Sequence, residues 1–301
     1  MRNLIIKKIL DEMLVNKDIF FLTADMGINL VEPIQEKFPD RFLNVGIAEQ
    51  NLIGVSAGLA NLGYRPFAYT ISNFLIHRCL EQIRNDVSLH DYPVTLIGTS
   101  TGFDNAPLGP THHITDDWGM LKGFANFQVF CPSSRAFAES LVSRVLADSK
   151  PTYVRVPKGN PVEPDSVEDV ISIGSGNSEV VLVTYGSLAQ ECLTVKETNP
   201  EISLVILNRI HPLDEKLLAN RLQAHKVAFC VEDHSSTSGL FSSLCEVVVR
   251  NQLNTDVLPF GPTRSTFEVG GTADYYHRIF NLDSDSLVKR IGKFSGNRWL
   301  P

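Results

Sequence analysis

The sequence predicts an α/β fold of two tandem domains, each with a mostly parallel sheet that is covered by helices on both faces. Short apolar runs of strand length alternate along the chain with longer segments of helical periodicity. Most of the expected strands are apolar on both faces, which is typical of covered parallel sheets. The alternation breaks once and then restarts. We therefore expect a first domain over residues 1–160, a linker over 161–178 and a second domain over 179–301.

The first domain is expected to open with a helix and to continue as alternating strands and helices. Residues 2–15 place apolar side chains on one helical stripe, with lysine and acidic side chains opposite. The apolar run 19–23 is too short for a core helix and lies between Asp18 and Asp25, so it predicts a buried strand. The other expected strands are 42–45, 66–71, 94–99, 127–130 and 152–156. The expected helices between them are 48–62, 73–89 and 134–147.

The second domain repeats this alternation after a segment that resembles a connector. From residue 157 to 178, Pro and Gly recur among acidic and small polar residues, as in interdomain linkers. The strands expected after it are 180–184, 204–207 and 227–231, and the helices are 188–198, 215–222 and 239–250. Residues 284–301 are polar, and we expect them to be irregular.

Composition and charge favour a cytoplasmic globular protein. Of 301 residues, 43% are hydrophobic and 20% are charged, the balance of a chain with a substantial core. The formal charge is −7 without a run of Lys or Arg, so neither nucleic acid nor an anionic membrane is an expected partner. The five cysteines form no C-x-x-C pair, which argues against a zinc site or a disulfide framework. The first residues lack the apolar core of a signal peptide, and no apolar run reaches 18 residues.

Ser100 lies in a pattern that could indicate a serine hydrolase. The segment Gly98-Thr-Ser-Thr-Gly102 matches the nucleophile elbow G-x-S-x-G and follows an expected strand. The elbow must open into a helix, whereas this segment runs into Phe-Asp-Asn-Ala-Pro-Leu-Gly-Pro. A serine hydrolase is therefore a distant alternative.

Two adjacent histidines, His112 and His113, could suggest a metal site because Asp116 and Asp117 follow them closely. Adjacent loop residues seldom point the same way, and no second His or Cys cluster completes a coordination shell. We expect no metal ligands in this chain. The segment is interpreted as a polar loop at the carboxyl edge of a sheet.

Glu49 stands where an expected strand gives way to a helix with many small residues. The small residues are Gly54, Ser56, Ala57, Gly58 and Ala60. A carboxylate at a helix N-terminus could serve only to compensate the helix dipole. The small residues would equally allow another chain to approach closely. These residues alone leave both interpretations open.

Several motifs in chain order resemble those of the transketolase superfamily. The turn Ile47-Ala48-Glu49-Gln50 and the small-residue helix after it resemble the family's catalytic-glutamate motif. Further matches are Ala24-Asp25-Met26, Phe74 to Ile83 (F-x-x-x-R-x-x-E-Q-I), Gly109-Pro110-Thr111-His112, Pro132-Ser133, Pro151 to Asn160 (P-x-x-x-R-x-P-K-G-N), Val183 to Ser187, His211 to Asp214 and Val231 to His234. The resemblance covers residues 1 to about 270.

The resemblance implies an enzyme that uses thiamine diphosphate and that needs a second chain. In the family, one domain binds the diphosphate through Mg²⁺ with a G-D-G…N motif, and another domain holds the aminopyrimidine. This sequence contains no G-D-G and resembles the pyrimidine-binding and C-terminal domains. The expected partner is an N-terminal transketolase-like subunit that carries the diphosphate and Mg²⁺. Self-association into a heterotetramer is also expected.

The resemblance also assigns roles to individual residues. Glu49 would hydrogen-bond the aminopyrimidine and so activate the cofactor, and Asp25, Phe74 and Arg78 would lie against it, with Phe74 stacked on the ring. His112 would act on the substrate. Arg155, at the end of an expected strand, could bind a substrate phosphate as a fork or could form a surface ion pair.

The expected reaction is transfer of a two-carbon ketol unit between a ketose, commonly phosphorylated, and an aldose. The F-x-x-x-R spacing and the G-P-T-H loop favour this type. A 1-deoxyxylulose-5-phosphate-synthase-like chain and the beta subunit of a 2-oxo-acid dehydrogenase are the alternatives within the family. Leu108 and Ser100 stand where typical transketolases carry substrate-binding Asp and His residues, so we expect an unusual sugar substrate.

Overall fold

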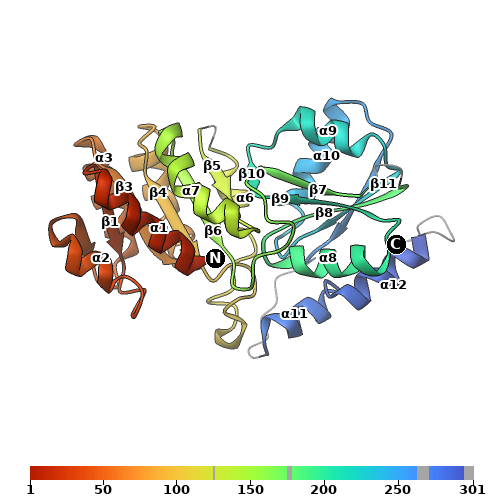
Figure 1. Ribbon diagram of the computed structural model, residues 1–301, viewed down its shortest axis with the longest axis horizontal. Helices are drawn as coiled ribbons and strands as arrows, with labels where there is room; N and C mark the ends of the chain where they lie inside the picture. The colour runs from red at the N-terminus through yellow and green to blue at the C-terminus, as the bar shows by residue number, and fades with distance from the viewer. Residues whose placement is uncertain (125, 175–177, 263–270, 295–301) are drawn as a thin grey trace.

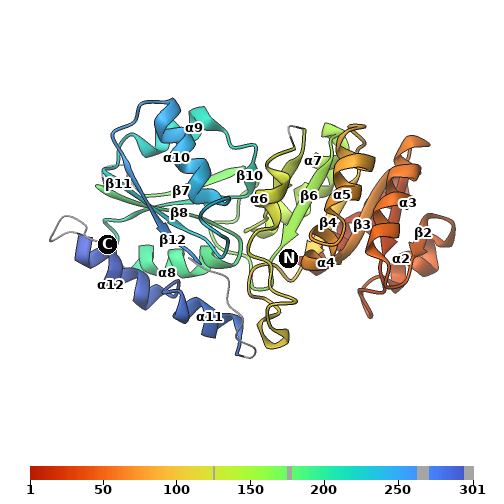
Figure 2. The same cartoon turned by 180° about the vertical axis from the view of Figure 1, so that it is seen from behind.

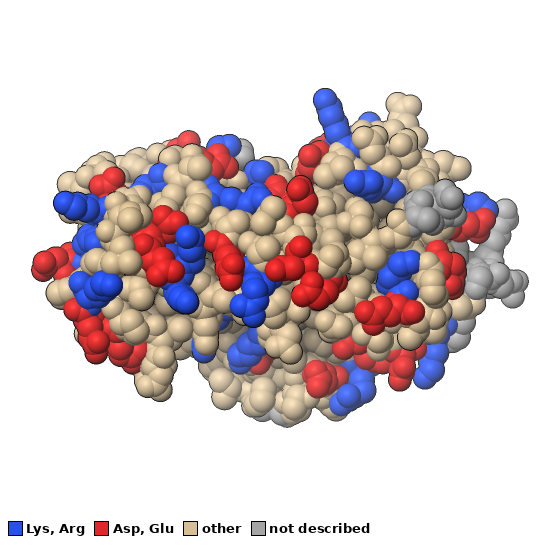
Figure 3. Space-filling model, viewed as in Figure 1, with Lys and Arg blue, Asp and Glu red and all other residues tan. Residues whose placement is uncertain are grey.

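A computed structural model describes residues 1–124, 126–174, 178–262 and 271–294. They form two α/β domains that lie side by side, one around a seven-stranded sheet and one around a five-stranded sheet (Figure 1). Figure 3 shows acidic and basic side chains interspersed over one face, with a notch between the domains. None of the helices within these residues is long and apolar enough to cross a membrane.

The first sheet has the strand order β10-β5-β6-β4-β3-β1-β2 and is parallel except at β10. Its strands are β1 (Ile19–Thr23), β2 (Phe42–Asn44), β3 (Arg65–Ile71), β4 (Thr95–Thr99), β5 (Gln128–Phe130), β6 (Thr152–Val156) and β10 (Arg209–His211). Helices α1 (Arg2–Val15), α2 (Glu32–Lys37) and α7 (Arg135–Asp148) cover one face. Helices α3 (Glu49–Asn61), α4 (Ser72–Ile76), α5 (Leu80–Gln82) and α6 (Asp117–Leu121) cover the other (Figure 2).

The second sheet has the order β12-β11-β8-β9-β7 and is parallel except at β7. Its strands are β7 (Val170–Ile173), β8 (Val180–Tyr185), β9 (Ser203–Leu207), β11 (Val227–Val231) and β12 (Asp256–Phe260). Helices α9 (Glu215–Leu222) and α10 (Leu240–Arg250) cover one face, and α8 (Ala189–Thr198) and α12 (Ser284–Phe294) cover the other. The short helix α11 (Ala273–Ile279) precedes α12.

Local sequence explains where several of these elements begin. Ser134 caps α7 by accepting a hydrogen bond from the Phe137 amide at 3.2 Å, and Asp214 caps α9 through the Leu217 amide at 2.9 Å. Of the expected apolar stripe of α1, Ile5, Ile6, Ile9 and Met13 are buried against the sheet, Leu10 is half-buried and Leu14 is exposed. The predicted fold class is confirmed.

The structure corrects four expectations about individual segments. The expected linker contains β7, which pairs with β9 as the edge strand of the second sheet. Residues 209–211 lie in the second half of the sequence but pair with β5 of the first sheet. The single helix expected over 73–89 is divided into α4, α5 and a π-helical turn over Ile83–Ser88. Residues 284–294 are helical, not irregular, and 295–301 lie outside the described residues.

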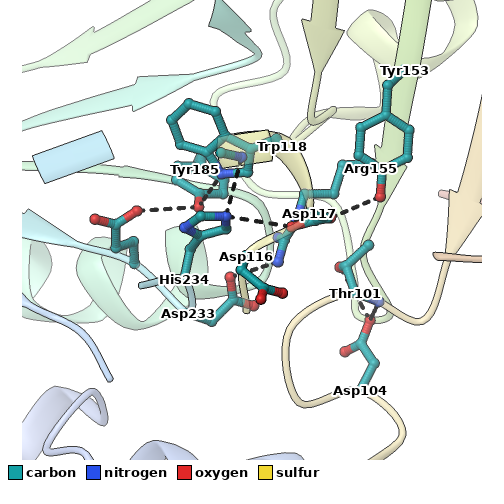
Figure 4. A network of polar contacts seen from close by, with 12 residues as sticks. Thr101, Asp104, Asp116, Asp117, Trp118, Tyr153, Arg155, Tyr185, Asp233 and His234 are labelled. Atoms are coloured by element: carbon teal, nitrogen blue, oxygen red, sulfur yellow. Dashed lines mark hydrogen bonds and ion pairs between the residues drawn. The ribbon is translucent and has the colours of Figure 1, made fainter. Parts of the chain in front are cut away.

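A buried cluster of charges joins the two domains (Figure 4). Arg155, at the end of β6, is 0% exposed, with Nε 3.0 Å from Asp117 Oδ2 in α6 and Nη2 3.1 Å from Asp233 Oδ1 after β11. The Tyr153 hydroxyl donates to Asp117 Oδ2 at 2.7 Å. Burial opposes the charge of Arg155, but the carboxylates of Asp117 and Asp233 raise its pKa above the usual value. One arginine therefore pairs with a carboxylate from each domain.

A second row of polar contacts lies beside this cluster. Trp118 Nε1 donates to the Tyr185 hydroxyl at 2.9 Å, and that hydroxyl donates to Glu232 Oε2 at 3.4 Å. Glu232 accepts from the amides of Leu240 and Phe241, at 2.7 and 2.9 Å, where α10 begins. Burial raises the pKa of Glu232 to about 7. The junction is thus hydrogen-bonded from the first domain to the start of α10.

Replacing Arg155 by Met should destabilise the fold far more than the same change at the surface. In R155M two buried carboxylates lose their counter-charge, which costs about 3–5 kcal/mol. The matched control is R250M, because Arg250 pairs with Glu215 at 2.6 Å where both side chains are exposed, and such pairs contribute about 0–1 kcal/mol. Urea unfolding of both variants measures the difference. Equal midpoints would show that the junction does not depend on this cluster.

Candidate active site

The carboxyl edge of the first sheet gathers most of the residues that the sequence singles out. Strands β1, β3 and β4 are parallel neighbours, so their carboxyl ends meet at one edge. Asp25 follows β1, Phe74 lies in α4 directly after β3, and Ser100 follows β4. Glu49 is the first residue of α3, which follows β2. Ligands of open α/β sheets bind at this edge.

Glu49, Phe74 and Arg78 form one contiguous group. The Glu49 side chain is 2% exposed, and its carboxylate forms an ion pair with the Arg78 guanidinium. The guanidinium carbon lies 4.6 Å from the centre of the Phe74 ring. Gln50 Nε2 donates to the Arg78 carbonyl at 3.1 Å. A buried carboxylate, a flat cation and an aromatic ring thus lie in one group.

His112 lies against the same ring. Its imidazole meets Phe74 edge-on, with ring centres 5.1 Å apart and planes at 71°. The backbone beside it is fixed, because Asn73 Nδ2 donates to the Thr111 carbonyl. This contact brings the G-P-T-H loop onto α4.

Two residues that the sequence analysis missed, Asn73 and His77, continue this contact to Asp116, which it considered only as a metal ligand. Asn73 Oδ1 lies 2.6 Å from His77 Nδ1, and His77 Nε2 lies 2.8 Å from Asp116 Oδ1. The hydrogen bond that His77 donates to the Asp116 carboxylate raises the pKa of His77. His77 and Asp116 are 39 residues apart, so no local pattern could reveal the pair. Only the position of Asn73, directly before Phe74, was a signal.

Asp25 and Ser100 occupy strained backbone at the same edge. Both have positive φ, 50° for Asp25 and 63° for Ser100, which is uncommon for residues other than Gly. Asn44 Oδ1 accepts from the amides of Asp25 and Gly46 at 2.9 and 3.0 Å, which ties the end of β1 to the turn before Glu49. Non-glycine residues in this conformation concentrate at functional sites.

The loop after Ser100 does not have the geometry of a nucleophile elbow. No helix follows Ser100 directly; Gly102 forms a bridge with Ile114, and the next element is the short 3₁₀ turn Ala106–Leu108. Ser100 is also buried. The geometry therefore does not support the serine hydrolase. Leu108, which ends the 3₁₀ turn, is 57% exposed.

Arg155 is neither an accessible phosphate ligand nor part of a surface ion pair, the two roles that the sequence suggested. Its guanidinium is enclosed between the carboxylates of Asp117 and Asp233, so the structure corrects both the phosphate ligand and the surface ion pair. A run of apolar strand residues up to Arg155 does not reveal that its side chain points into the domain junction. The carboxylate partners come from positions 117 and 233, which the sequence does not connect.

Lys158, three residues further on, is an exposed cation that the sequence analysis missed. Its ammonium donates to the Asp104 carbonyl at 3.0 Å and to Asn105 Oδ1 at 2.8 Å, two neutral acceptors. Lys158 lines a pocket of about 230 Å³ together with Ser133, and the buried Ser133 hydroxyl has no hydrogen-bond partner within the described residues. Its position after Pro157, beyond the strand, was the available signal. Among the residues that the structure describes, no three His, Cys, Asp or Glu side chains gather as a metal site.

Comparison with known proteins agrees with this arrangement. The family model of the transketolase pyrimidine binding domain matches residues 1–162, and that of the transketolase C-terminal domain matches residues 170–280. A relative from Actinobacillus succinogenes, named as one subunit of an apulose-4-phosphate transketolase, is 30% identical over 267 residues, which cover 86% of this chain and 86% of the relative. A 1-deoxy-D-xylulose-5-phosphate synthase from Halothermothrix orenii is 26% identical, and this chain spans 46% of its length.

A solved structure agrees over nearly the whole chain. It is titled a split gene transketolase, inactive beta4 tetramer, and its TM-score is 0.86 at 26% identity, with 97% of both chains covered. Both family models match in tandem, and their order is that of the two domains in the structure. The chain therefore belongs to the transketolase superfamily, of which it contains the pyrimidine-binding and C-terminal domains.

Proposed function

We propose that this chain is the cofactor-activating subunit of a thiamine-diphosphate-dependent transketolase that transfers a two-carbon ketol unit from a ketose, commonly phosphorylated, to an aldose. The observation that carries the proposal is the buried Glu49 carboxylate beside Phe74 at the carboxyl edge of the first sheet. Thiamine diphosphate is the cofactor that the family implies.

The residues present fit the aminopyrimidine of that cofactor. In this structure the Arg78 guanidinium lies over Phe74 and bonds to Glu49. A guanidinium and an aminopyrimidine are both flat, and the N–H donors of each lie in the plane of the group. Glu49 and Phe74 can therefore hold the pyrimidine once Arg78, which is partly exposed, turns aside. The guanidinium bound to Glu49 and stacked on Phe74 supports the cofactor-binding role of these two residues.

The protein's own residues supply position and protons. When bound, the cofactor supplies the carbon nucleophile that adds to a substrate carbonyl. Glu49, excluded from water, holds a proton at a ring nitrogen of the pyrimidine. Phe74 orients the ring by stacking. His112, in contact with Phe74, is placed to exchange a proton with a substrate oxygen.

A partner chain would complete the site. We assign the diphosphate and Mg²⁺ to an N-terminal transketolase-like subunit, because this sequence lacks the G-D-G motif. The side of the site nearest Asp25 and Glu49 exposes the apolar side chains of Ile28 (82%) and Ile47 (77%), which suits burial by another protein. The similar split gene transketolase is titled a tetramer of its beta chain, which supports self-association in a heterotetramer. All five cysteines are free, which suits the cytoplasm.

Substrate choice would depend on Lys158 and the loop from Ser100 to Leu108. We assign to Lys158 the phosphate-binding role that the sequence analysis gave to Arg155. Lys158 lines a pocket, and its ammonium donates to two neutral oxygen atoms. Leu108 cannot accept a hydrogen bond from a sugar hydroxyl. The relative named for apulose 4-phosphate gives the first substrate to test. A synthase-type reaction with pyruvate is the second candidate, favoured by the segment Pro151 to Asn160.

The reconstituted complex should be active, and the free chain should not. We expect ketol transfer only when the chain is mixed with an N-terminal subunit that carries G-D-G, with pyruvate tested as the alternative donor. In the complex, E49Q should lower kcat by roughly 10²–10⁴, the scale for loss of a positioned proton-transfer group. E215Q, a change of the same kind at the surface of the second domain, is the matched control. Full turnover by the free chain, or normal kcat in E49Q, would reject the proposal.

Lys158→Met should weaken the binding of phosphorylated sugars selectively. Loss of one charged hydrogen bond to phosphate corresponds to roughly a 10–150-fold rise in KM. The KM of the unphosphorylated sugar should stay the same. K226M removes an exposed lysine from the second domain and serves as the control. An equal effect on both sugars would show that Lys158 does not contact the phosphate.

Common pentose phosphates should be poor substrates because of Leu108. A sugar hydroxyl buried against it lacks a partner, at a cost of about 1–3 kcal/mol. We expect kcat/KM with xylulose 5-phosphate and ribose 5-phosphate below about 10⁴ M⁻¹s⁻¹, and a higher value with apulose 4-phosphate. L108D should raise activity on xylulose 5-phosphate. Values above that level in the wild type would show that Leu108 does not limit the substrate.

A further inference from the structure

A loop of the first domain, residues 101–113, packs against helix α11 of the second domain. Phe103 is almost fully buried, and its ring lies parallel to that of Tyr276, with centres 5.0 Å apart and planes at 8°. It is also nearly parallel to Phe280, the C-cap of α11, at 5.5 Å and 14°. Tyr276 and Phe280 are four residues apart, so one face of α11 holds the ring.

His113 completes this group from the other end of the loop. It meets Tyr276 edge-on at 4.7 Å and Phe103 edge-on at 5.3 Å. Burial lowers the pKa of His113, so its imidazole packs as a neutral ring. We call Phe103, His113, Tyr276 and Phe280 the aromatic clamp. The clamp lies apart from the three main clusters of buried side chains that support the sheets.

The two adjacent histidines therefore face different neighbours. His113 packs in the aromatic clamp, whereas the ring of His112 meets Phe74 at 5.1 Å. A displacement of His113 must move His112, because one peptide bond joins them. The clamp is thus coupled directly to the candidate catalytic histidine.

The ends of the loop are also tied to the second domain. Gly102, with φ 54°, packs so closely on the Asp233 carboxylate that a Cβ atom there would overlap it. Beyond the loop, the Ser235 amide donates to the Thr115 carbonyl at 2.6 Å. Both contacts come from the segment that follows β11. The second domain therefore holds the loop near both ends: α11 contacts Phe103 and His113, and the segment after β11 contacts Gly102 and Thr115.

We propose that α11 is a positioning element of the active site: Tyr276 and Phe280 act through Phe103 and His113 to hold His112 against Phe74. This inference rests on the proposed function, which gives His112 its role. The clamp residues are positioning residues and act through His112. The inference gives the second domain a part in the reaction, although the pyrimidine-binding residues all come from the first domain.

The kinetic test compares Y276L with Y276F in the reconstituted complex. Y276L removes the stacked ring, and we expect kcat to fall by roughly 10–100-fold, the scale for a catalytic group displaced by about 1 Å. The affinity for thiamine diphosphate should change less than about twofold, because Glu49 and Phe74 lie outside the clamp. Y276F keeps the ring and should restore kcat. F260L is the matched control: it removes a ring stacked on Phe229 at 4.8 Å in the core of the same domain.

Hydrogen exchange on the isolated full chain tests the clamp without activity. In Y276L the peptides that cover residues 101–113 should exchange about tenfold faster, equivalent to about 1.4 kcal/mol of local stability. Peptides from β4 should not change. F280L, which removes a half-buried ring, replaces Y276L if that variant does not fold. Exchange in F260L should rise in the second-domain core and not in the loop.

The two measurements separate the two proposals. A wild-type complex without activity, with faster loop exchange in Y276L, would reject the function and support the clamp. Unchanged loop exchange and unchanged kcat in Y276L would overturn the clamp. An equal loss of kcat in F260L would also overturn the clamp, because a general loss of stability would then explain the lower kcat of both variants.

Discussion

The ion pairs of Arg155 with Asp117 and Asp233 fix the relation between the two domains. Each carboxylate comes from a different domain, and within the described residues neither has another Lys or Arg side chain within 4.0 Å. His234 lies 3.7 Å from Asp117, but burial lowers the pKa of this histidine. The segment that carries Asp233 also packs against the start of the loop 101–113, at Gly102. The position of the loop, and of His112 at its end, thus depends on a charge cluster that does not touch the site itself.

The site is built from backbone geometry as much as from side chains. Positive φ at Asp25 and Ser100 turns the chain at two strand ends, and Asn44 ties one of these turns to the segment before Glu49. The ion pair of Glu49 with Arg78 offsets the charge of a carboxylate that is shielded from water. The free chain therefore keeps the Glu49 carboxylate paired, and a ligand that displaces Arg78 must supply hydrogen-bond donors of its own.

Sequence predicted the fold class and most elements because the parallel strands are buried on both faces and read as continuous apolar runs. It failed at β7, β10 and β12, which all lie at sheet edges, where little apolar pattern is required. Of these, β7 and β10 are also short and antiparallel to their neighbours. At the site, sequence found Glu49, Phe74, Arg78 and His112 through motifs. It misplaced Arg155 and missed His77 and Lys158, since their partners lie far away in sequence and only the fold brings them together.

Strand β10 has a consequence for how the chain can be divided. It crosses from the second half of the sequence to pair with β5, and Asn208 just before it binds the amides of Cys131 and Ser133 at 2.8 and 2.7 Å. A protein cut between the two matched family regions would leave β5 as an open edge, with unpaired backbone groups that invite aggregation. The two domains have separate cores but share one strand, because β10 belongs to the first sheet and to the second half of the sequence. Duplication, fusion or splitting of the gene would keep β5 covered only where the segment of β10 remains available to pair with it.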